Sequence, residues 1–488
     1  MKSILKWLSV NGIKLVLWVV ILLIPLLGVW TASSLAAFVN SIPWLAVAAG
    51  LMLFPVLPLA WDALSEYRRA KKAKAKKKEN KRILTFGDRL LMRTLFVNLV
   101  FLSVFVFAFP QQLVRSLTIR GDWFLDGYDG PTAQKVREAL LAAADHLEWL
   151  WKASEEDNPF EDMNQTAKQA PPPKAAELDK VVPQVDIAKL VQTEQQQRDP
   201  RKWPLEPTLS PIVVHMPKEA QGSFESVARY IESQEKDPFL RAKAIHDYIA
   251  NAISYDAVAL DEGRYPPQDA KTVFETKVGV CAGYANLFVA MCSAMGLEAI
   301  YVTGDSRDMD GAIAGVKHAW NAVKLDDQWH LIDATWDAGY LEGSTFVRRY
   351  TNDYLFTPPE IFAFNHLPKE EGWQLLKNPI SRGEFARQVP LRPSFIAAGF
   401  ELESPTRSQV TVSSALDLRI QSSGERFLLV KYKAKEGGAV GDCTVSGETT
   451  LSVTCTLPQE GTYFVQLFIG VARYGTYDFA GQIEVNKS

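Results

Sequence analysis

Cysteine and histidine are scarce in this chain, whose 488 residues include four cysteines and six histidines. No second cysteine or histidine stands at the C-x2-C or H-x3-H spacing that zinc sites use, which disfavours a metal centre. No calcium-binding motif and no internal repeat is evident in the sequence. The net charge of −3 gives no reason to expect nucleic acid as a partner. We therefore expect no cofactor and no metal. The few cysteines and histidines are the first candidates for catalytic residues.

One of these cysteines opens an apolar segment. Cys281 lies between Gly279 and Gly283, and residues 282–295 carry apolar side chains at helical spacing. The sequence therefore predicts a helix with Cys281 at or near its N-terminus, where free N–H groups and the helix dipole favour a thiolate. Cys292 falls in the middle of the same helix and is interpreted as an ordinary apolar core residue.

A histidine and an aspartate follow on two segments that alternate as strands. Pairing Leu325 with Gln328 across a two-residue turn places Trp320 opposite Asp333, with His318 two residues along on the same face. Such diagonal neighbours are about 7–8 Å apart at the backbone, close enough for an imidazole to meet a carboxylate. This is the layout of a thiol nucleophile with its base and the residue that orients the base.

The remaining histidines are weaker candidates for a catalytic role. His330 alternates to the face opposite Asp333 and is interpreted as structural. A zinc site built on Cys281 and His318 is a less favoured alternative, and coincidental packing is less favoured still. Four other histidines have no comparable setting and are interpreted as ordinary surface or core residues: His146, His215, His246 and His366.

Residues 224–336, which contain these three side chains, resemble the transglutaminase-like superfamily. The resemblance includes an upstream helix at 241–256, and it implies a papain-like α+β core with a Cys-His-Asp triad. By the resemblance Cys281 is the nucleophile, His318 the base and Asp333 the orienting residue. It identifies no oxyanion-stabilising side chain, and the backbone N–H of Cys281 is our candidate for part of that hole.

A second resemblance is more specific. The segments that follow the core are similar to those of kyphoscoliosis peptidase-like proteins, which separates this chain from ordinary protein-crosslinking transglutaminases. Together with the missing calcium motif, the resemblance favours hydrolysis over crosslinking. The similar segments are residues 350–360, 366–368, 373–376, 379–381 and 384–385.

Three hydrophobic runs precede this region, at residues 13–30, 42–61 and 91–109. The first two are long enough for a bilayer that needs about 20 residues. The third is shorter and carries Arg93, which we expect to snorkel to the headgroups. A signal peptide is disfavoured because no cleavage site is convincing and two more runs follow. Three spans are predicted, and the lack of charge within them argues against transport or sensing.

Charge gives the orientation of these spans. The loop at 62–90 contains a basic cluster at 68–82, whereas the loop between the first two runs is uncharged. The positive-inside rule places the basic loop in the cytoplasm and everything after residue 111 outside the membrane. A nucleic-acid patch is a less favoured interpretation of the cluster, and attraction to anionic lipid is compatible with it. Since organelle signals are absent, we favour a bacterial inner membrane with the catalytic domain on the periplasmic side.

The rest of the chain divides by pattern. Residues 1–115 form the membrane region, and 116–207 are predicted to hold one helix at 132–152 and then a flexible tether of about 50 residues. For residues 203–211 an irregular part of the folded domain is the alternative. Residues 208–400 form the transglutaminase-like domain with its extension. Residues 401–488 contain six or seven short alternating segments, which predict an immunoglobulin-like β-sandwich that binds or packs.

Two cysteines in the last region flank a turn centred on Thr449. A hairpin there sets Cys443 opposite Cys455, where a cross-strand disulfide is geometrically plausible. Such a bond agrees with an oxidising compartment outside the membrane. Two free structural thiols fit the sequence equally well.

The sequence thus predicts a multi-domain protein with transmembrane helices, an α+β papain-like core and a C-terminal all-β sandwich. The expected function is that of a thiol enzyme in which Cys281 attacks a peptide or side-chain amide and His318 protonates the leaving amine. The partner is then a protein or peptide substrate, cell-wall peptide included. Two alternatives stay open: a crosslinker that passes the thioester to an amine, and a binding scaffold with a vestigial triad.

Overall fold

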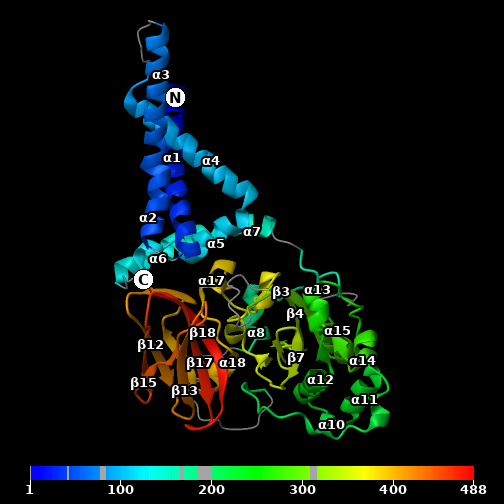
Figure 1. Cartoon of the computed structure of the whole chain (residues 1–488). Coiled ribbons are helices and arrows are strands. Elements are labelled where there is room, and N and C mark those ends of the chain that lie inside the picture. The colour runs from blue at the N-terminus through cyan, green and yellow to red at the C-terminus, as the bar shows by residue number, and fades with distance from the viewer. Residues whose placement is uncertain are drawn as a thin grey trace. The chain divides into compact units, whose positions relative to one another are not determined.

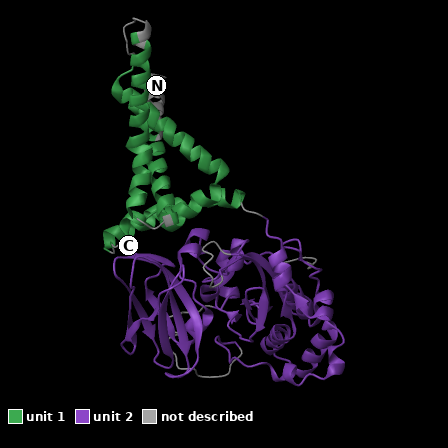
Figure 2. Cartoon of the chain, in the orientation of Figure 1, with its two compact units in different colours: residues 1–155, 488 green, residues 156–487 purple. Residues whose placement is uncertain are grey.

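The computed structural model divides into two compact units, residues 1–155 with 488 and residues 156–487 (Figure 2). Residues 77–83 of the predicted basic loop and 184–200 of the predicted tether lie outside the residues that the structure describes. The described residues are 2–40, 43–76, 84–126, 128, 130–154, 157–164, 170–183, 201–307 and 316–487.

The first unit is helical (Figure 1). Three of its helical stretches are long and apolar enough to cross a membrane, namely Ile21–Val39, Pro43–Lys72 and Phe86–Ala108, which agrees with the number of runs predicted. The predicted helix at 132–152 is interrupted at 146–147. The elements are α1 (Lys2–Asn40), α2 (Pro43–Leu51), a π-helical turn (Met52–Val56), α3 (Leu57–Lys76), α4 (Phe86–Ala108), α5 (Pro110–Arg120), a 3-10 turn (Trp123–Leu125), α6 (Pro131–Asp145) and α7 (Glu148–Ala153).

Charged side chains of α3 and α4 form one cluster. Arg93 forms an ion pair with Asp62 of α3 and donates a hydrogen bond to the Ser65 hydroxyl. Arg89 joins the same cluster, with its Nε 2.9 Å from Asp62 Oδ1. Asp62 and Arg89 lie just outside the predicted runs at 42–61 and 91–109, so the cluster gives Arg93 a partner and adds no further charge within the runs.

The described parts of the predicted tether are folded into the second unit. Phe160 is 1% exposed, and Leu178 and Trp203 are buried in two other hydrophobic clusters. The prediction of a mostly flexible tether is therefore wrong for these parts, where isolated large apolar side chains hold the chain against the domain. Two short helical elements lie here, a 3-10 turn (Ala175–Glu177) and α8 (Leu178–Val181).

The α+β core of the second unit combines a five-stranded sheet with a group of helices (Figure 1). The strand order is β8-β5-β4-β3-β9, and all neighbours in it are antiparallel. The strands are β3 (Glu298–Ser306), β4 (Val316–Leu325), β5 (Gln328–Ile332), β8 (Leu355–Thr357) and β9 (His366–Pro368). The helices are α10 (Pro211–Val214), α11 (Phe224–Gln234), α12 (Pro238–Ala252), α13 (Ala257–Glu262), α14 (Ala270–Thr276) and α15 (Cys281–Ala294), with a 3-10 turn at Lys218–Gln221.

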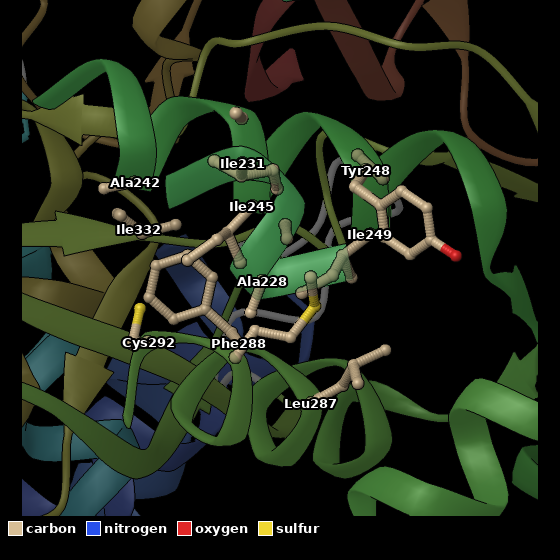
Figure 3. Close-up of a cluster of buried hydrophobic side chains, with 14 of the residues drawn as sticks. Ala228, Ile231, Ala242, Ile245, Tyr248, Ile249, Leu287, Phe288, Cys292 and Ile332 are labelled. Carbon is tan, nitrogen blue, oxygen red and sulfur yellow. The ribbon is translucent and has the colours of Figure 1, made fainter. Parts of the chain in front are cut away.

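Helices α11 and α12 pack with α15 around one apolar cluster (Figure 3). Ile231, Ile245 and Phe288 are fully buried there, and burial of such side chains contributes roughly 1.5–3 kcal/mol each. Cys292 lies in the same cluster, which confirms its interpretation as a core residue. Burial also raises the pKa of the Cys292 thiol, so this sulfur is held as an inert thiol.

The β4–β5 hairpin has the predicted register. Leu325 pairs with Gln328 and Asn321 with Ile332, so the next residue pair in the register is Trp320 with Asp333. The two-residue turn is Asp326-Asp327, with φ of 47° and 63°. These left-handed values suit the turn type that joins twisted antiparallel strands.

The shorter elements around this core are two small sheets and several helical turns. β1 (Ser254–Tyr255) pairs with β2 (Val278–Gly279), and β6 (Gly339–Glu342) pairs with β7 (Thr345–Arg348). The helical turns are α16 (Pro359–Phe362), a 3-10 turn (Glu371–Gln374), α17 (Arg382–Arg387) and α18 (Pro393–Ala397).

The C-terminal part forms two sheets, of four strands in the order β10-β12-β16-β15 and of five in the order β11-β18-β17-β13-β14. Every predicted strand segment after residue 401 is present. The strands are β10 (Phe400–Ser404), β11 (Gln409–Val412), β12 (Ala415–Ser422), β13 (Phe427–Ala434), β14 (Val440–Asp442), β15 (Thr444–Ser446), β16 (Thr450–Thr456), β17 (Gly461–Gly470) and β18 (Tyr477–Lys487).

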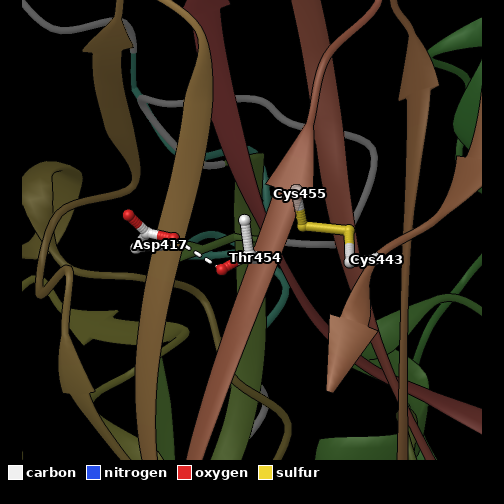
Figure 4. The surroundings of a disulfide bond; sticks show 4 residues. All are labelled: Asp417, Cys443, Thr454 and Cys455. Carbon is white, nitrogen blue, oxygen red and sulfur yellow. Dashed lines mark hydrogen bonds between the residues drawn. A yellow bond between two sulfur atoms is a disulfide. The ribbon is translucent and has the colours of Figure 1, made fainter. Parts of the chain in front are cut away.

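A disulfide joins Cys443 and Cys455, with 4.4 Å between their Cα atoms (Figure 4). Thr444 pairs with Thr454 in the β15–β16 ladder, so the two cysteines stand opposite each other just beyond it. Both are buried in the apolar core of this region. The cross-strand pairing predicted from the symmetric turn is confirmed, and the alternative of two free thiols is not what the structure has.

Candidate active site

Cys281 is the first residue of α15, as the sequence predicts. The residue before it, Val280, is the N-cap, and its carbonyl accepts the N–H groups of Gly283 and Tyr284. A side chain at position 283 has no room, because a Cβ there would lie 2.5 Å from Gln268 Oε1. The thiol therefore stands at the positive end of a helix dipole, in a setting that stabilises a thiolate.

His318 and Asp333 meet across the β4–β5 hairpin. His318 Nε2 lies 2.7 Å from Asp333 Oδ2, and the other carboxylate oxygen accepts the backbone N–H groups of Thr335 and Trp336. Burial acts to raise the pKa of Asp333, but the charge of His318 and the two histidine hydrogen bonds hold it well below its usual range. Asp333 is therefore a fully buried anion whose position is fixed by its partners.

The thiol of Cys281 and the His318 imidazole are also hydrogen-bonded. Burial acts to lower the pKa of His318. The charge and hydrogen bond of Asp333, together with the hydrogen bond to Cys281, outweigh burial and raise that pKa to about 10. The structure thus brings together all three residues singled out from the sequence, with His318 in the middle.

A fourth side chain at this site was missed. His366 Nε2 lies 3.0 Å from Asp333 Oδ2, the same oxygen that contacts His318. His366 is the first residue of β9, which pairs with β3 at the edge of the core sheet. It is buried, as a core residue would be, but its interpretation as an ordinary residue missed the contact with Asp333, and its place in the segment similar to kyphoscoliosis peptidase-like proteins was the available signal.

His318, Asp333 and His366 also form a group of potential metal ligands among the described residues. Their donor atoms lie within 4.8 Å of one another, and all three are buried. The two Nε2 atoms already share one carboxylate oxygen at hydrogen-bond distance. A metal ion here would have to replace both of those hydrogen bonds.

A tyrosine lies beside the thiol. The backbone N–H of Cys281 donates to the hydroxyl of Tyr255, which follows α12 in the short strand β1. Burial, with the charge of Cys281 next to it, raises the pKa of Tyr255 well above its usual value. Tyr255 therefore stays a neutral phenol that can also donate a hydrogen bond.

Cys281 shares a buried environment with the segment at 157–164. It is 1% exposed and lies in one hydrophobic cluster with Phe160 and Tyr301. Asn158 Nδ2 contacts the backbone carbonyls of Gly304 and His318 at 3.3 and 3.4 Å, and the Tyr301 hydroxyl donates to the Phe160 carbonyl at 2.7 Å. We therefore expect this segment, which is far away in the sequence, to help shield the thiol from solvent.

Phe160→Ala is expected to raise the rate at which iodoacetamide alkylates Cys281 by about tenfold or more. Loss of the buried aromatic side chain lowers the free energy needed to open the segment locally. The measurement is peptide mass spectrometry of the alkylated full chain. Leu178→Ala is the matched control, since Leu178 anchors another part of the same region in a different cluster. Equal rates in wild type and Phe160→Ala would contradict the shielding role.

A second buried histidine network lies on α12. His246 Nδ1 is 3.0 Å from Asp247 Oδ1, and its Nε2 is 3.0 Å from Asp337 Oδ2. Burial acts to lower the pKa of His246, but the hydrogen bonds to both carboxylates raise it to about 9. Asp247 is also bound by Lys243 and the Tyr350 hydroxyl. The sequence interpretation of His246 as an ordinary residue missed these ion pairs.

Comparison with known proteins defines the class first. Residues 225–334 match the family described as the Transglutaminase-like superfamily, so this chain carries a transglutaminase-like domain. The match spans α11 to the residue that follows Asp333, and thus includes Cys281 and His318.

Among individual proteins, the chain is similar to kyphoscoliosis peptidase. It is 30% identical to that of Mus musculus over 256 residues, which cover 51% of this chain and 38% of the mouse protein. It is 30% identical to that of Homo sapiens over 237 residues, covering 47% and 35%. The chain thus spans little more than a third of the length of these relatives. A solved structure titled as the crystal structure of a TGase has 25% identity and a TM-score of 0.21, covering 28% of this chain and 37% of that one.

Proposed function

We propose that this chain is a thiol enzyme that cleaves peptide or side-chain amide bonds, with Cys281 as nucleophile, His318 as general acid and base, and Asp333 as the residue that orients His318. The observation that carries the proposal is the hydrogen-bonded series from the Cys281 thiol through His318 to Asp333. Its placement at the N-terminus of α15 adds the helix dipole to the stabilisation of the thiolate.

The chemistry follows from this arrangement. With its pKa raised to about 10, His318 holds a proton at neutral pH and forms an ion pair with the Cys281 thiolate. The sulfur attacks the carbonyl carbon, and His318 gives its proton to the amine nitrogen as the C–N bond breaks. His318 then takes a proton from water, the hydroxide adds to the thioester, and the C–S bond breaks to return the thiol.

Two groups are proposed to stabilise the oxyanion. The Cys281 backbone N–H stands at the helix start, and the Tyr255 hydroxyl lies within its reach. An oxygen that becomes negative next to the sulfur can accept from both groups once the phenol turns its hydrogen toward it. Tyr255 is thus our candidate for the side chain that the sequence did not identify.

Hydrolysis is favoured over transfer to an amine because the similar mouse and human proteins are named peptidases. A crosslinker would form the same thioester and then transfer its acyl group to an amine. A binding scaffold would form no thioester. The observation that speaks against the scaffold is the complete set of hydrogen bonds around His318, which packing alone does not require.

We further propose that the enzyme is anchored in a membrane and acts outside the cytoplasm, with a peptide such as that of a bacterial cell wall among its substrates. Support comes from three helices long and apolar enough to span a membrane. The Cys443–Cys455 disulfide is typical of oxidising compartments. We propose an immunoglobulin-like binding or packing role for the C-terminal pair of sheets.

The proposed function is tested by alkylation of the full chain with iodoacetamide across pH, read at Cys281 by peptide mass spectrometry. In the Phe160→Ala background, where Cys281 is more accessible, we expect alkylation to proceed well below pH 8.5, the midpoint of an ordinary thiol, and to be slower at neutral pH when His318→Ala is added. Cys292 provides an internal control, because it is buried and inert in the same helix. Cys281 that stays unreactive, even in Phe160→Ala, or that ignores His318→Ala would overturn the enzyme proposal.

A further inference from the structure

The segment at 157–164 is held through its backbone carbonyls. The Tyr301 hydroxyl donates to the Phe160 carbonyl at 2.7 Å, and Asn286 Nδ2 donates to the Met163 carbonyl at 2.7 Å. Tyr301 belongs to β3 and Asn286 to α15, so the core sheet and the helix of the nucleophile bind the same short stretch. Hydrogen bonds to the main chain give a site affinity for a peptide of any sequence.

Phe160 adds a contact that depends on the side chain. It is 1% exposed, and its ring meets that of Tyr265 edge to face, with 5.5 Å between the centroids. The buried cluster around Phe160 contains several residues too small to fill the space that a ring takes, namely Ala282, Ala285 and Ala319. Tyr265, Asn286 and Tyr301 thus outline a site for a peptide with one aromatic side chain, which we call the peptide groove.

The peptide groove lies beside the catalytic residues. Burial, together with the charge of Cys281, raises the pKa of Tyr265 and of Tyr301, so both phenols lie within electrostatic reach of the sulfur. Asn158 Nδ2 contacts the backbone carbonyl of His318 at 3.4 Å. A peptide bound in this groove is therefore next to both the nucleophile and the base, as a substrate of the proposed reaction has to be.

The peptide groove has room beyond the segment. A cavity of about 230 Å³ adjoins Glu161 and Asn164, and Tyr301 and Trp373 are among the residues that line it. Lys369 also lines this cavity and forms an ion pair with Glu161. Both partners are partly exposed, so the pair adds little affinity, and the aromatic and backbone contacts dominate.

We propose that the peptide groove is the substrate-binding site of the enzyme, and that residues 157–164 occupy it as an internal peptide with Phe160 in its aromatic pocket. The inference rests on the proposed function and deepens it, because it names the substrate class. That substrate is a peptide with a large aromatic side chain, followed by an acidic residue that faces Lys369. The segment and the substrate compete for one site, so the chain inhibits itself until the segment opens.

The test is competition by a free peptide. In the full-length Phe160→Ala chain in detergent, Cys281 is alkylated with iodoacetamide at about pH 9, where any thiol is largely ionised. A synthetic peptide of residues 157–164 is added at about 1 mM, which is typical of the effective concentration of a tethered segment. We expect it to slow alkylation by about threefold or more. The same peptide with alanine in place of Phe160 is the matched control and should leave the rate unchanged.

This readout needs no catalysis, so it separates the inference from the proposed enzyme. Absent protection by the peptide of residues 157–164, or equal protection by the alanine peptide, overturns the inference even where His318→Ala slows alkylation at neutral pH. Protection that requires the aromatic ring, together with an indifferent His318→Ala variant, supports a peptide site and overturns the enzyme proposal.

If Phe160→Ala does not fold, hydrogen exchange of the wild-type chain decides. The Phe160 N–H donates to Asn158 Oδ1 at 3.0 Å, so its exchange reports opening of the segment. One opening should expose this amide and the Cys281 thiol together. We therefore expect amide exchange and thiol alkylation to be slowed, relative to an unfolded peptide, by factors that agree within about tenfold. Factors that differ by about a hundredfold or more overturn the inference.

Discussion

Asp333→Asn is expected to lower the rate of Cys281 alkylation at pH 7 by about tenfold or more, because His318 loses the anion that raises its pKa and so holds its proton less firmly beside the sulfur. Asparagine keeps the shape of the side chain, and its Oδ1 can still accept the N–H groups of Thr335 and Trp336. Its amide N–H2 replaces the oxygen that His318 and His366 share. Both histidines then lose their anionic acceptor, and His318 no longer holds the proton that stabilises the thiolate.

The experiment compares alkylation rates of the wild-type chain, Asp333→Asn and Asp327→Asn at several pH values. Asp327 is the matched control, because it lies in the turn of the same hairpin with a fully exposed side chain and a φ of 63° that asparagine tolerates. The alkylation rates of Asp333→Asn and wild type should converge above about pH 9, where any thiol is largely ionised. A rate at pH 7 that is unchanged in Asp333→Asn would remove Asp333 from the mechanism.

His246→Leu is expected to cost the second unit about 3–5 kcal/mol of stability, because it leaves the carboxylates of Asp247 and Asp337 buried without their shared cation. A loss of this size corresponds to a fall in the melting temperature of roughly 10 °C for a domain of this size. Calorimetry or circular dichroism measures the shift. His215→Leu is the control, since His215 is exposed and its ring contacts the carbonyl of Pro211 one turn before it. Equal melting temperatures would contradict the ion-pair role.

The same network predicts how stability depends on pH. The pKa of His246 rises from an unfolded value of about 6.5 to about 9 in the fold. A raised pKa stabilises the fold fully below the unfolded value, and this stabilisation is lost as the pH rises through about 9. The wild-type melting temperature should therefore fall between pH 7 and 10 more steeply than that of His246→Leu.

Local patterns predicted much of the fold. The helical spacing after Cys281, the alternation on both sides of Asp326-Asp327 and the alternating segments after residue 401 each extend over a few neighbouring residues. Such periodicities show which face is buried, and the β4–β5 register follows from the turn alone. The approach of His318 to Asp333 could be inferred because a single hairpin creates it.

The contacts that the sequence did not predict join residues far apart in the chain. His366 meets Asp333 across 33 residues, His246 meets Asp337 across 91, and Phe160 meets Tyr301 across 141. No periodicity links such pairs, since each depends on how the helices and strands pack. The described parts of the predicted tether could not be recognised as folded for the same reason. Single residues such as Phe160 and Leu178 anchor them in two different clusters, and the sequence around these residues has no repeating apolar pattern.

The position of Cys281 on α15 has a consequence for motion. Eleven of the fourteen residues of this helix are buried, and its other end carries Phe288 and Cys292 into the main apolar core. Freeing the helix would cost nearly the whole stability of the domain, so its amide hydrogens should be among the last to exchange with solvent. The sulfur is thus held in a fixed position, and its exposure to solvent would require movement of the residues packed against it rather than of α15.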